Sequence, residues 1–418
     1  MRPSPKASLV ALFTADILSA LGTRVSAVAI PWLVLLSTGS ASKMGVIAAA
    51  EMLPYALTGV LAAPFADRFG HRRTSVVTDV GSALAMVAVI LSPGSSFLHL
   101  AVLVAAGGAL RGIGDRVKHV MLRPLAEQCG VGMLRVASLY EGLSRGATLV
   151  GAPLGGLLIA LLGTHGALWA DAISFALCGL LVATLVVLPV EESAEAEAPV
   201  KEPYWTALRG GFSFLRGDQV LIGMMVMTFA INVFSQASGS VFTPLWVEEV
   251  VGSPVVLGLL FGGFAGGALL GNVIFTVYAD RIPQYRAFLI GALVGGAPRL
   301  LTMGLSDQVW LVVSVSFLTG IANASLNPVI GATLYTRVPP ALQTRVFGLM
   351  GALTFAGIPV GSLLGGWSVA WLGLRPALLT AGGLFLLATL IPVIQMCRRP
   401  LSIPKYGSPA QPKTEEAA

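Results

Sequence analysis

The sequence predicts an all-α integral membrane protein, with twelve transmembrane helices in two six-helix bundles that are related by a parallel repeat. Three observations predict this fold: an apolar composition, apolar runs long enough to cross a bilayer, and similarity between the two halves of the chain. Hydrophobic residues make up 55% of the 418 residues and charged residues 11%, against roughly 45–50% and about 25% in soluble domains. The 49 glycines also suit membrane helices, where small residues let backbones approach closely.

Apolar stretches of about 20 residues, the length that crosses a bilayer, recur along almost the whole chain. The first, from Leu9 to Leu36, is too long for the apolar part of a signal peptide and lacks a cleavage site, so we expect it to remain as a helix. The twelve expected spans are centred near residues 22, 55, 83, 107, 150, 178, 232, 267, 295, 322, 357 and 386. We expect an N-terminal bundle over 1–189, a cytoplasmic linker with room for a surface helix over 190–217, a C-terminal bundle over 218–397 and a disordered cytoplasmic tail over 398–418.

The basic residues predict the orientation of these spans. With the N-terminus in the cytoplasm, 19 of the 21 lysines and arginines outside the spans, Lys118 among them, fall on the cytoplasmic side, and only Lys43 and Arg375 fall on the other. This asymmetry predicts that both termini are cytoplasmic. The net charge of +6 then reflects topology and anionic lipid rather than nucleic acid. Five arginines lie in or at the edge of spans: Arg24, Arg111, Arg116, Arg145 and Arg299.

The two halves of the chain match each other at nearly constant offsets of 213 and then 210 residues. Because each half has an even number of expected spans, both halves have the same orientation in the membrane. Parallel halves, related by an axis along the membrane normal, suit alternating access around a site at the midplane. The matched positions include Asp67-Arg68 with Asp280-Arg281, Gly45 with Gly258, Arg135 with Arg345, Gly151 with Gly361, and Gly156 with Gly366.

The loop between the second and third expected spans concentrates charge in "ADRFGHRR". It resembles the loop motif G-x-x-x-D-R-x-G-R-[RK] of the major facilitator superfamily, which the chain resembles over nearly its whole length. The resemblance implies that this loop latches the cytoplasmic faces of the two halves in the outward-open state. In physical terms, an aspartate can cap the third helix and a glycine permits the tight turn; the alternative is a turn that only sets topology. The matching residues are Asp67, Arg68, Gly70, Arg72 and Arg73, whereas Ala63 and His71 depart from the motif.

A second motif, "GAPLGG", lies in the fifth expected span. It resembles the antiporter motif G-P-x-x-G-G of drug exporters, with the proline displaced by one position; ordinary small-residue packing is the alternative. With "WADAISF" at 169–175, the chain is also similar to the macrolide- and tetracycline-type efflux subgroup and to siderophore exporters, although Thr23-Arg24 and Ser82 stand where that pattern has an aspartate and an arginine. The motif residues are Gly151, Pro153, Gly155 and Gly156.

Acidic residues in the expected spans are confined to the first bundle: Asp16, Glu51, Asp79, Asp115, Glu141 and Asp171. A charge at the bilayer centre costs about 2.5–3.5 kcal/mol on insertion scales, so each acid needs a partner or a wet cavity. Helix spacing pairs Arg111 with Asp115 and Glu141 with Arg145, and Asp79 and Asp171 lie near expected helix starts, where capping is the simple interpretation.

Asp16, Glu51 and Glu141 are then the candidates for carrying protons. Burial disfavours the charged form of a carboxyl group and a neighbouring cation favours it, so rocking between the bundles can exchange a proton for substrate. The charged residues expected to modulate them are Arg24, Arg111, Asp115 and Arg145. The second bundle offers an aromatic and amide wall suited to amphipathic ligands: Phe229, Asn232, Phe234, Gln236, Asn323 and Asn327.

The sequence therefore predicts a secondary transporter of the bacterial inner membrane that exports small amphipathic molecules by proton antiport. A siderophore or metabolite exporter, and a facilitator or importer of small metabolites, are the alternatives. An enzyme is not expected, because the histidines are scattered and no nucleophile–base or metal constellation occurs. The expected partners are a small-molecule substrate, protons and the lipid bilayer, with no nucleic acid and no cofactor besides the proton gradient, and the chain is expected to act as a monomer.

Overall fold

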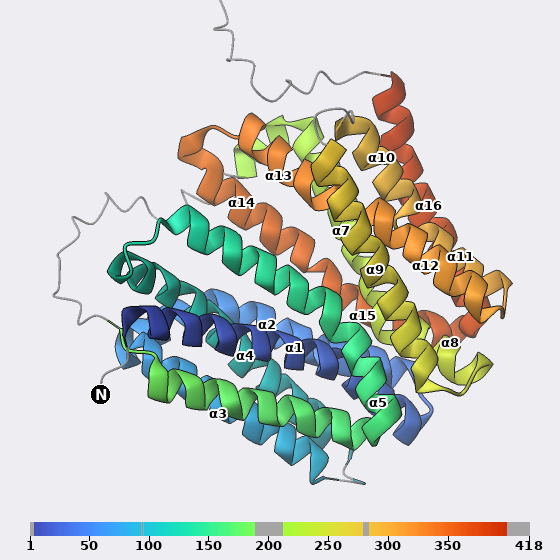
Figure 1. Cartoon of the computed structure of the whole chain (residues 1–418). Helices are drawn as coiled ribbons and strands as arrows, with labels where there is room; N and C mark the ends of the chain where they lie inside the picture. The colour runs from blue at the N-terminus through green and yellow to red at the C-terminus, as the bar shows by residue number, and fades with distance from the viewer. Residues whose placement is uncertain (1–3, 93, 95, 189–211, 279–283, 399–418) are drawn as a thin grey trace, which may run out of the picture.

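The computed structural model describes residues 4–92, 94, 96–188, 212–278 and 284–398. These residues form helices and short connections, without a strand (Figure 1). The expected linker lies outside the described residues up to residue 211, and 212–217 is helical. The expected tail lies outside them from residue 399 onward.

The first half of the chain folds into long helices whose ends follow local chemistry. The first begins after Ser4, whose side chain accepts a hydrogen bond from the Ala7 N–H, and it ends at Gly39, which has a φ of 61°. The expected fifth and sixth spans form one element that turns at Gly163, where φ is 73° and ψ is 172°. The elements are α1 (Pro5–Thr38), α2 (Ala41–Phe69), α3 (His71–Ile90), α4 (Phe97–Gln128) and α5 (Met133–Leu185).

The second half has shorter elements because its helices are interrupted inside the expected spans. One interruption is the π-helical turn η1, and another is the bend at Gly295-Gly296. The elements are α7 (Gln219–Ala237), η1 (Ser238–Phe242), α8 (Thr243–Val250), α9 (Pro254–Tyr278), α10 (Gln284–Val294), α11 (Ala297–Leu305), α12 (Val309–Asn323), α13 (Leu326–Arg337), α14 (Pro340–Phe355), α15 (Gly357–Leu372) and α16 (Leu374–Arg398).

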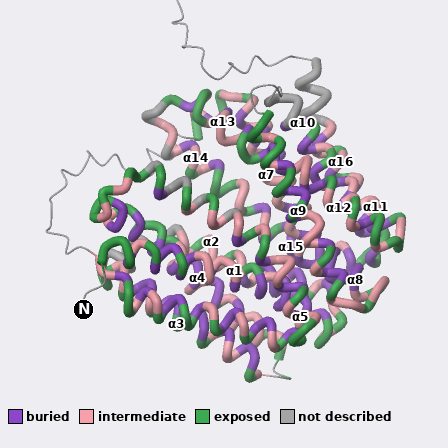
Figure 2. Tube along the Cα trace, viewed as in Figure 1, coloured by how far each residue is buried: buried purple, intermediate pink, exposed green. Residues whose placement is uncertain are grey.

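The described residues contain nine helices long and apolar enough to cross a membrane, and Leu374–Leu390 forms a shorter apolar helix. One of the nine, Gly142–Leu185, contains both the fifth and the sixth expected spans. The all-α membrane fold is therefore confirmed, whereas the count of twelve spans stays a prediction. Figure 2 shows buried residues where helices face one another and exposed residues around the outside. Large apolar side chains are among the exposed residues, for example Trp310 and Trp371.

Two sequence expectations about charge are wrong. Lys118 was placed on the cytoplasmic surface, but it lies inside α4 with 1% of its surface exposed. The spans of the second bundle were expected to lack acids, but α8 continues through Glu248 and Glu249 at the end of a span. Both glutamates are at least partly exposed, so the buried acids among the described residues still belong to the first bundle alone.

The two halves meet through α2 with α15 and through α5 with α9. Both meetings are backbone to backbone. A Cβ atom on Gly156 would lie 2.5 Å from the Cα of Gly258, and one on Gly366 would lie 3.2 Å from the Cα of Gly45. Gly45 and Gly258 lie near the starts of α2 and α9, at matching positions of the repeat. Their partners, Gly366 and Gly156, also match each other in the repeat. Both contacts therefore join the halves at the same end of the molecule.

Candidate functional site

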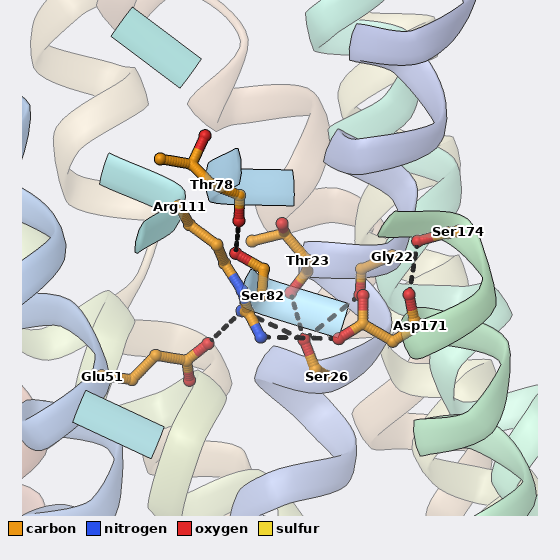
Figure 3. A network of polar contacts seen from close by, with 9 residues as sticks. All are labelled: Gly22, Thr23, Ser26, Glu51, Thr78, Ser82, Arg111, Asp171 and Ser174. Carbon is orange, nitrogen blue, oxygen red and sulfur yellow. Dashed lines mark hydrogen bonds and ion pairs between the residues drawn. The ribbon is translucent and has the colours of Figure 1, made fainter. Parts of the chain in front are cut away.

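A buried arginine joins four helices of the first bundle (Figure 3). Arg111 of α4 forms an ion pair with Glu51 of α2 at 2.6 Å and with Asp171 of α5 at 3.5 Å, and it donates a hydrogen bond to Ser26 of α1 at 3.3 Å. At most 3% of the surface of each charged side chain is exposed. The guanidinium also lies 5.0 Å from the ring centre of Phe175, a cation–π distance.

The local sequence makes room for this network. Gly22 on α1 faces Asp171, and a Cβ atom at Gly22 would collide with the Asp171 carboxylate. Gly108 of α4 packs on the Glu51 backbone, and a Cβ atom there would collide with the Glu51 carbonyl oxygen. Small residues thus bring α1, α2 and α5 close enough for one guanidinium to reach acids from two helices.

These contacts correct the pairing expected from helix spacing. Arg111 does not pair with Asp115; its guanidinium reaches Glu51 and Asp171, while Asp115 accepts a hydrogen bond from Tyr55 at 3.1 Å. Nor does Asp171 cap a helix, since it lies well inside α5. Arg111 pairs with acids on other helices rather than with Asp115 on its own helix. A planar guanidinium can bond two carboxylates at once, and a single neighbour on the same helix offers only one.

A second buried pair lies farther along α4. Lys118 lies 2.8 Å from the Asp79 carboxylate of α3, and both side chains are almost fully buried. Its ammonium nitrogen has no aligned hydrogen-bond partner, so the contact is an ion pair. Asp79 lies in the middle of α3 rather than at its start, which excludes the expected capping role. Asp16 of α1 lies near Lys118 and near the Tyr140 hydroxyl group of α5.

The first bundle therefore buries more carboxylates than cations. Glu51 and Asp171 share Arg111, whereas Asp16 and Asp79 lie around Lys118 with the partly buried Asp115 nearby. When like charges crowd a low-dielectric site, a proton relieves their repulsion. This arrangement is chemically suited to taking up and releasing protons.

Sequence reasoning missed Asp79, Asp171 and Lys118 as members of these networks. A signal was present, because Arg111, Asp115 and Lys118 follow one another at helical spacings of four and three residues and so share one face of α4. Glu141 and Arg145 lie in α5, but their side chains are outside the described residues, so their expected pairing stays a prediction.

The charged loop is a tight turn between α2 and α3. Gly70, with a φ of 83°, precedes the first residue of α3, which confirms the expected need for glycine. The backbone places Asp67 inside α2, and its side chain is outside the described residues. Arg72 donates hydrogen bonds to the carbonyl oxygens of Val182 and Ala183 near the end of α5 in the same bundle, while Arg68 and Arg73 are exposed.

The motif "GAPLGG" lies between the first bundle and the second. Gly151 faces α1, where a Cβ atom would lie 2.5 Å from the Cβ of Arg24, and Gly155 also faces α1 at Val25. Gly156 faces Gly258 of α9, as described above. These close approaches support the packing interpretation of the motif, and they also show that it positions Arg24 and an interface between bundles.

A cavity of about 230 Å³ lies where the two bundles meet. Arg24 of α1 and Pro153 of α5 line it from the first bundle, and Arg299 of α11 lines it from the second. Its apolar wall includes the aromatic side chains Phe234, Phe261, Phe264 and Phe385. The charged residues among its described lining are the two arginines.

Of the six residues expected to form the substrate wall, the structure places Phe234 in this cavity. Two of the amides serve helix packing instead. Asn232 donates a hydrogen bond to the Thr354 carbonyl oxygen at 2.8 Å, and Asn323 donates one to the Gly295 carbonyl oxygen at 3.3 Å. Phe229, Gln236 and Asn327 are not among the residues that line the cavity. Within the described residues, no group of three or more His, Cys, Asp or Glu side chains is placed to hold a metal ion.

Residues 2–405 match the family described as "Transmembrane secretion effector", within the major facilitator superfamily. The chain belongs to this family. Other proteins are similar to it along most of its length. The "Multidrug efflux pump Tap" of Mycobacterium tuberculosis is 29% identical over 379 residues, which cover 88% of each chain. The "Multidrug resistance protein MdtG" of Proteus mirabilis is 26% identical over 328 residues, or 76% of this chain and 78% of that one.

Solved structures share the fold of this chain. The nucleoside transporter NupG matches with a TM-score of 0.76 over 93% of this chain and 98% of that one, at 11% identity. A bacterial homologue of the lysosomal transporter Spinster, in an inward-facing and occupied conformation, matches with a TM-score of 0.70 over 95% and 98%, at 13% identity. With the family match and the named relatives, the chain is a multi-pass membrane transporter of the major facilitator superfamily.

Proposed function

We propose that this transporter exports small amphipathic molecules, drugs or antibiotics among them, by proton antiport through alternating access. The observation that carries the proposal is the 29% identity to a multidrug efflux pump over 88% of both chains. The cavity between the bundles, with aromatic walls and few charges, is the kind of site that accepts amphipathic ligands.

The contacts between the bundles support alternating access. The described glycine contacts join α2 to α15 and α5 to α9 at one end. An interface built from small residues can separate without exposing large side chains that had been buried in it. The bundles can therefore rock relative to each other about the cavity between them. We assign the joined end to the outside of the cell, because the turns near Lys43 and Gly252 lie there on the charge-based topology. The cavity then opens toward the cytoplasm in this conformation.

The buried acids of the first bundle support proton coupling. Glu51 and Asp171 compete for one guanidinium, and Asp16 lies in a second cluster around Lys118. A movement that changes the distance from Arg111 to either acid changes how strongly that acid holds a proton. Glu51, Asp16 and Glu141 are the proposed carriers, and the proton gradient supplies the energy without any cofactor. The chain acts as a monomer in the bacterial inner membrane, with both termini in the cytoplasm.

Transport into inside-out membrane vesicles tests this function. A panel of antibiotics with anionic, neutral and cationic members is added outside the vesicles, and a proton gradient is imposed that makes the vesicle interior acidic. At least one member should accumulate in vesicles that contain the protein and should leave when nigericin and valinomycin collapse the gradient. If no member accumulates above vesicles without the protein, the export proposal is wrong. If accumulation persists without the gradient, proton antiport is wrong.

A further inference from the structure

Arg299 is a buried cation that pairs with no acidic side chain among the described residues. It lies in the first turn of α11, with 8% of its surface exposed, and it lines the central cavity. It donates a hydrogen bond to the Thr243 hydroxyl at 2.8 Å, and it lies 5.9 Å from the ring centre of Phe261. Its Nε has no hydrogen-bond partner, and no carboxylate among the described residues pairs with it.

The other buried cations show that this is unusual within the molecule. Arg111 has two carboxylates within ion-pair distance, and Lys118 has one. Leaving a charge buried without a counterion costs several kcal/mol, and in membrane proteins such groups mark ligand or ion pathways. Arg299 therefore lacks a counterion among the described residues, and an anionic ligand in the cavity would supply one.

The backbone beside Arg299 favours an anion at the same place. The helical path breaks at Gly295-Gly296, and both glycines line the cavity. The helix α11 begins at the next residue, so its N-terminus lies beside the cavity. The first N–H groups of a helix lack intrahelical acceptors, and the helix dipole makes this end positive. The nine residues of α11 thus present a positive end beside the guanidinium, which is the device that broken helices use for anionic groups in transporters.

The first bundle adds a second cation to the cavity, and the second bundle adds aromatic rings. Arg24 is exposed toward the cavity from α1. Phe234 and Phe385 stack with ring centres 5.0 Å apart and an interplanar angle of 14°. Gly296 allows this packing, because a Cβ atom there would collide with the Phe385 ring. An aromatic body can lie on these rings while a charged group reaches the arginines.

We propose that the cavity selects amphipathic molecules that carry an anionic group, such as a carboxylate, a sulfonate or a phosphonate. The anionic group binds Arg299 and the N-terminus of α11, and Arg24 contributes from the other bundle. The same two arginines repel cationic molecules of equal size. This inference rests on the proposed export function for its biological meaning, and it assigns the substrate class of that same cavity.

Two fluorescent probes that differ by one group test the inference. N-phenyl-1-naphthylamine is neutral, and 8-anilinonaphthalene-1-sulfonate adds a sulfonate to the same aromatic body. Binding of each probe to the full chain in lipid nanodiscs is measured as saturable fluorescence above empty nanodiscs. Because hydrogen bonds to charged groups are the stronger ones, Arg299→Gln should weaken sulfonate binding about tenfold or more and neutral-probe binding by less than about twofold.

Matched variants separate binding from folding. Arg299→Lys should retain part of the sulfonate affinity, since it keeps the charge and loses the fork. Arg375→Gln removes an exposed arginine of the same bundle that pairs with Asp307, and it should change neither probe. If Arg299→Gln does not fold, as judged by gel filtration and thermal unfolding, Arg24→Gln replaces an exposed residue and should also weaken the sulfonate selectively.

Each outcome decides the inference. Selective loss of sulfonate binding supports it. Equal loss of both probes, or unchanged sulfonate binding in Arg299→Gln and Arg24→Gln, overturns it and leaves Arg299 as a packing residue. The result is separate from transport. Selective sulfonate binding in a protein that moves nothing removes the export proposal alone, and transport of neutral or cationic compounds with no arginine-dependent sulfonate binding removes this inference alone.

Discussion

The backbone of Gly156 in α5 packs directly on the backbone of Gly258 in α9, since a Cβ atom on Gly156 would lie 2.5 Å from both the Cα and the N of Gly258. The repeat generates a second contact of the same kind. Gly366 of α15 corresponds to Gly156, Gly45 of α2 corresponds to Gly258, and these two residues also pack on each other. One interaction, used twice around a two-fold axis, therefore joins the bundles at one end.

We expect Gly156→Ala to impair transport while leaving each bundle folded. The added methyl group meets backbone that cannot turn aside, and overpacking of this kind costs about 1–3 kcal/mol. The cost falls on the joined conformation alone, so the population shifts toward the conformation open at that end. Transport into inside-out vesicles should fall about tenfold, in line with a shift of this size.

Gly223→Ala in α7 is the matched control for this prediction. A Cβ atom there meets nothing within 4 Å, and alanine favours helix more than glycine does. It should transport normally. Equal losses from Gly156→Ala and Gly223→Ala would show that the bundles tolerate no change in helix composition, rather than that the glycine contact matters.

We expect Arg111→Met to destabilise the protein strongly. The change leaves Glu51 and Asp171 buried without their shared cation, and breaking a buried pair by removing one partner costs about 3–5 kcal/mol. The thermal unfolding midpoint in detergent reports the loss. Adding Glu51→Gln and Asp171→Asn should recover much of it, because the uncompensated charges are then removed.

Arg123→Met provides the comparison for Arg111→Met. Arg123 lies on the same helix and pairs with Glu127, but 78% of its side chain is exposed, and exposed pairs contribute about 0–1 kcal/mol. Its unfolding midpoint should stay close to that of the unchanged protein. A similar fall for both variants would argue against the buried network.

The sequence predicted the fold because hydropathy and the repeat report on every span, and single contacts do not alter them. It predicted Glu51 and Asp16 as buried acids for the same reason, since a charge in an apolar run is conspicuous. The ion-pair partners of these buried charges were predicted poorly. Helix spacing finds neighbours on one helix, whereas Arg111 reaches acids on α2 and α5. Lys118 lay beyond the end of an expected span, so its burial depended on the length of α4.

The cavity was the least predictable feature. As polar groups on apolar helices, Asn232 and Asn323 are predicted to face substrate, but their amides donate hydrogen bonds to backbone carbonyl oxygens of neighbouring segments. The sequence shows that Arg299 is a charge within a span, but its place beside the break at Gly295-Gly296, and its lack of a described acidic partner, are visible only in the structure. Both are properties of packing between helices, which composition does not record.

The charge-based topology is tested by cysteine labelling in intact cells, in a chain whose three cysteines have been replaced. Gln308→Cys lies in the exposed turn before α12 and should react with an impermeant maleimide. Arg123 is also exposed and lies near the C-terminal end of α4, which the charge-based topology places in the cytoplasm. Arg123→Cys should therefore react only after the cells are opened. Labelling of Arg123→Cys in sealed cells would reverse the orientation.

Proton coupling is predicted to pass through at least one of Glu51, Asp16 and Glu141. We expect Glu51→Gln to have the largest effect, because it removes titration from an acid that shares Arg111 with Asp171 and lies 2.6 Å from the guanidinium. The amide keeps the size of the side chain and can still accept a hydrogen bond from Arg111. In proteoliposomes, this variant should exchange substrate down its own gradient but fail to concentrate it when a proton gradient is applied.

Asp16→Asn and Glu141→Gln, made singly, complete the series, and Glu127→Gln is the control because Glu127 is exposed at the end of α4. Proton release on substrate addition, followed with a pH dye, separates coupling from binding. A carrier variant should bind substrate without changing the proton signal, whereas a variant that only loosens packing loses both. Should all three variants still concentrate substrate against its gradient, the carriers are other acids, and Asp171 and Asp79 become the next to substitute because they are the remaining buried acids of the described bundle.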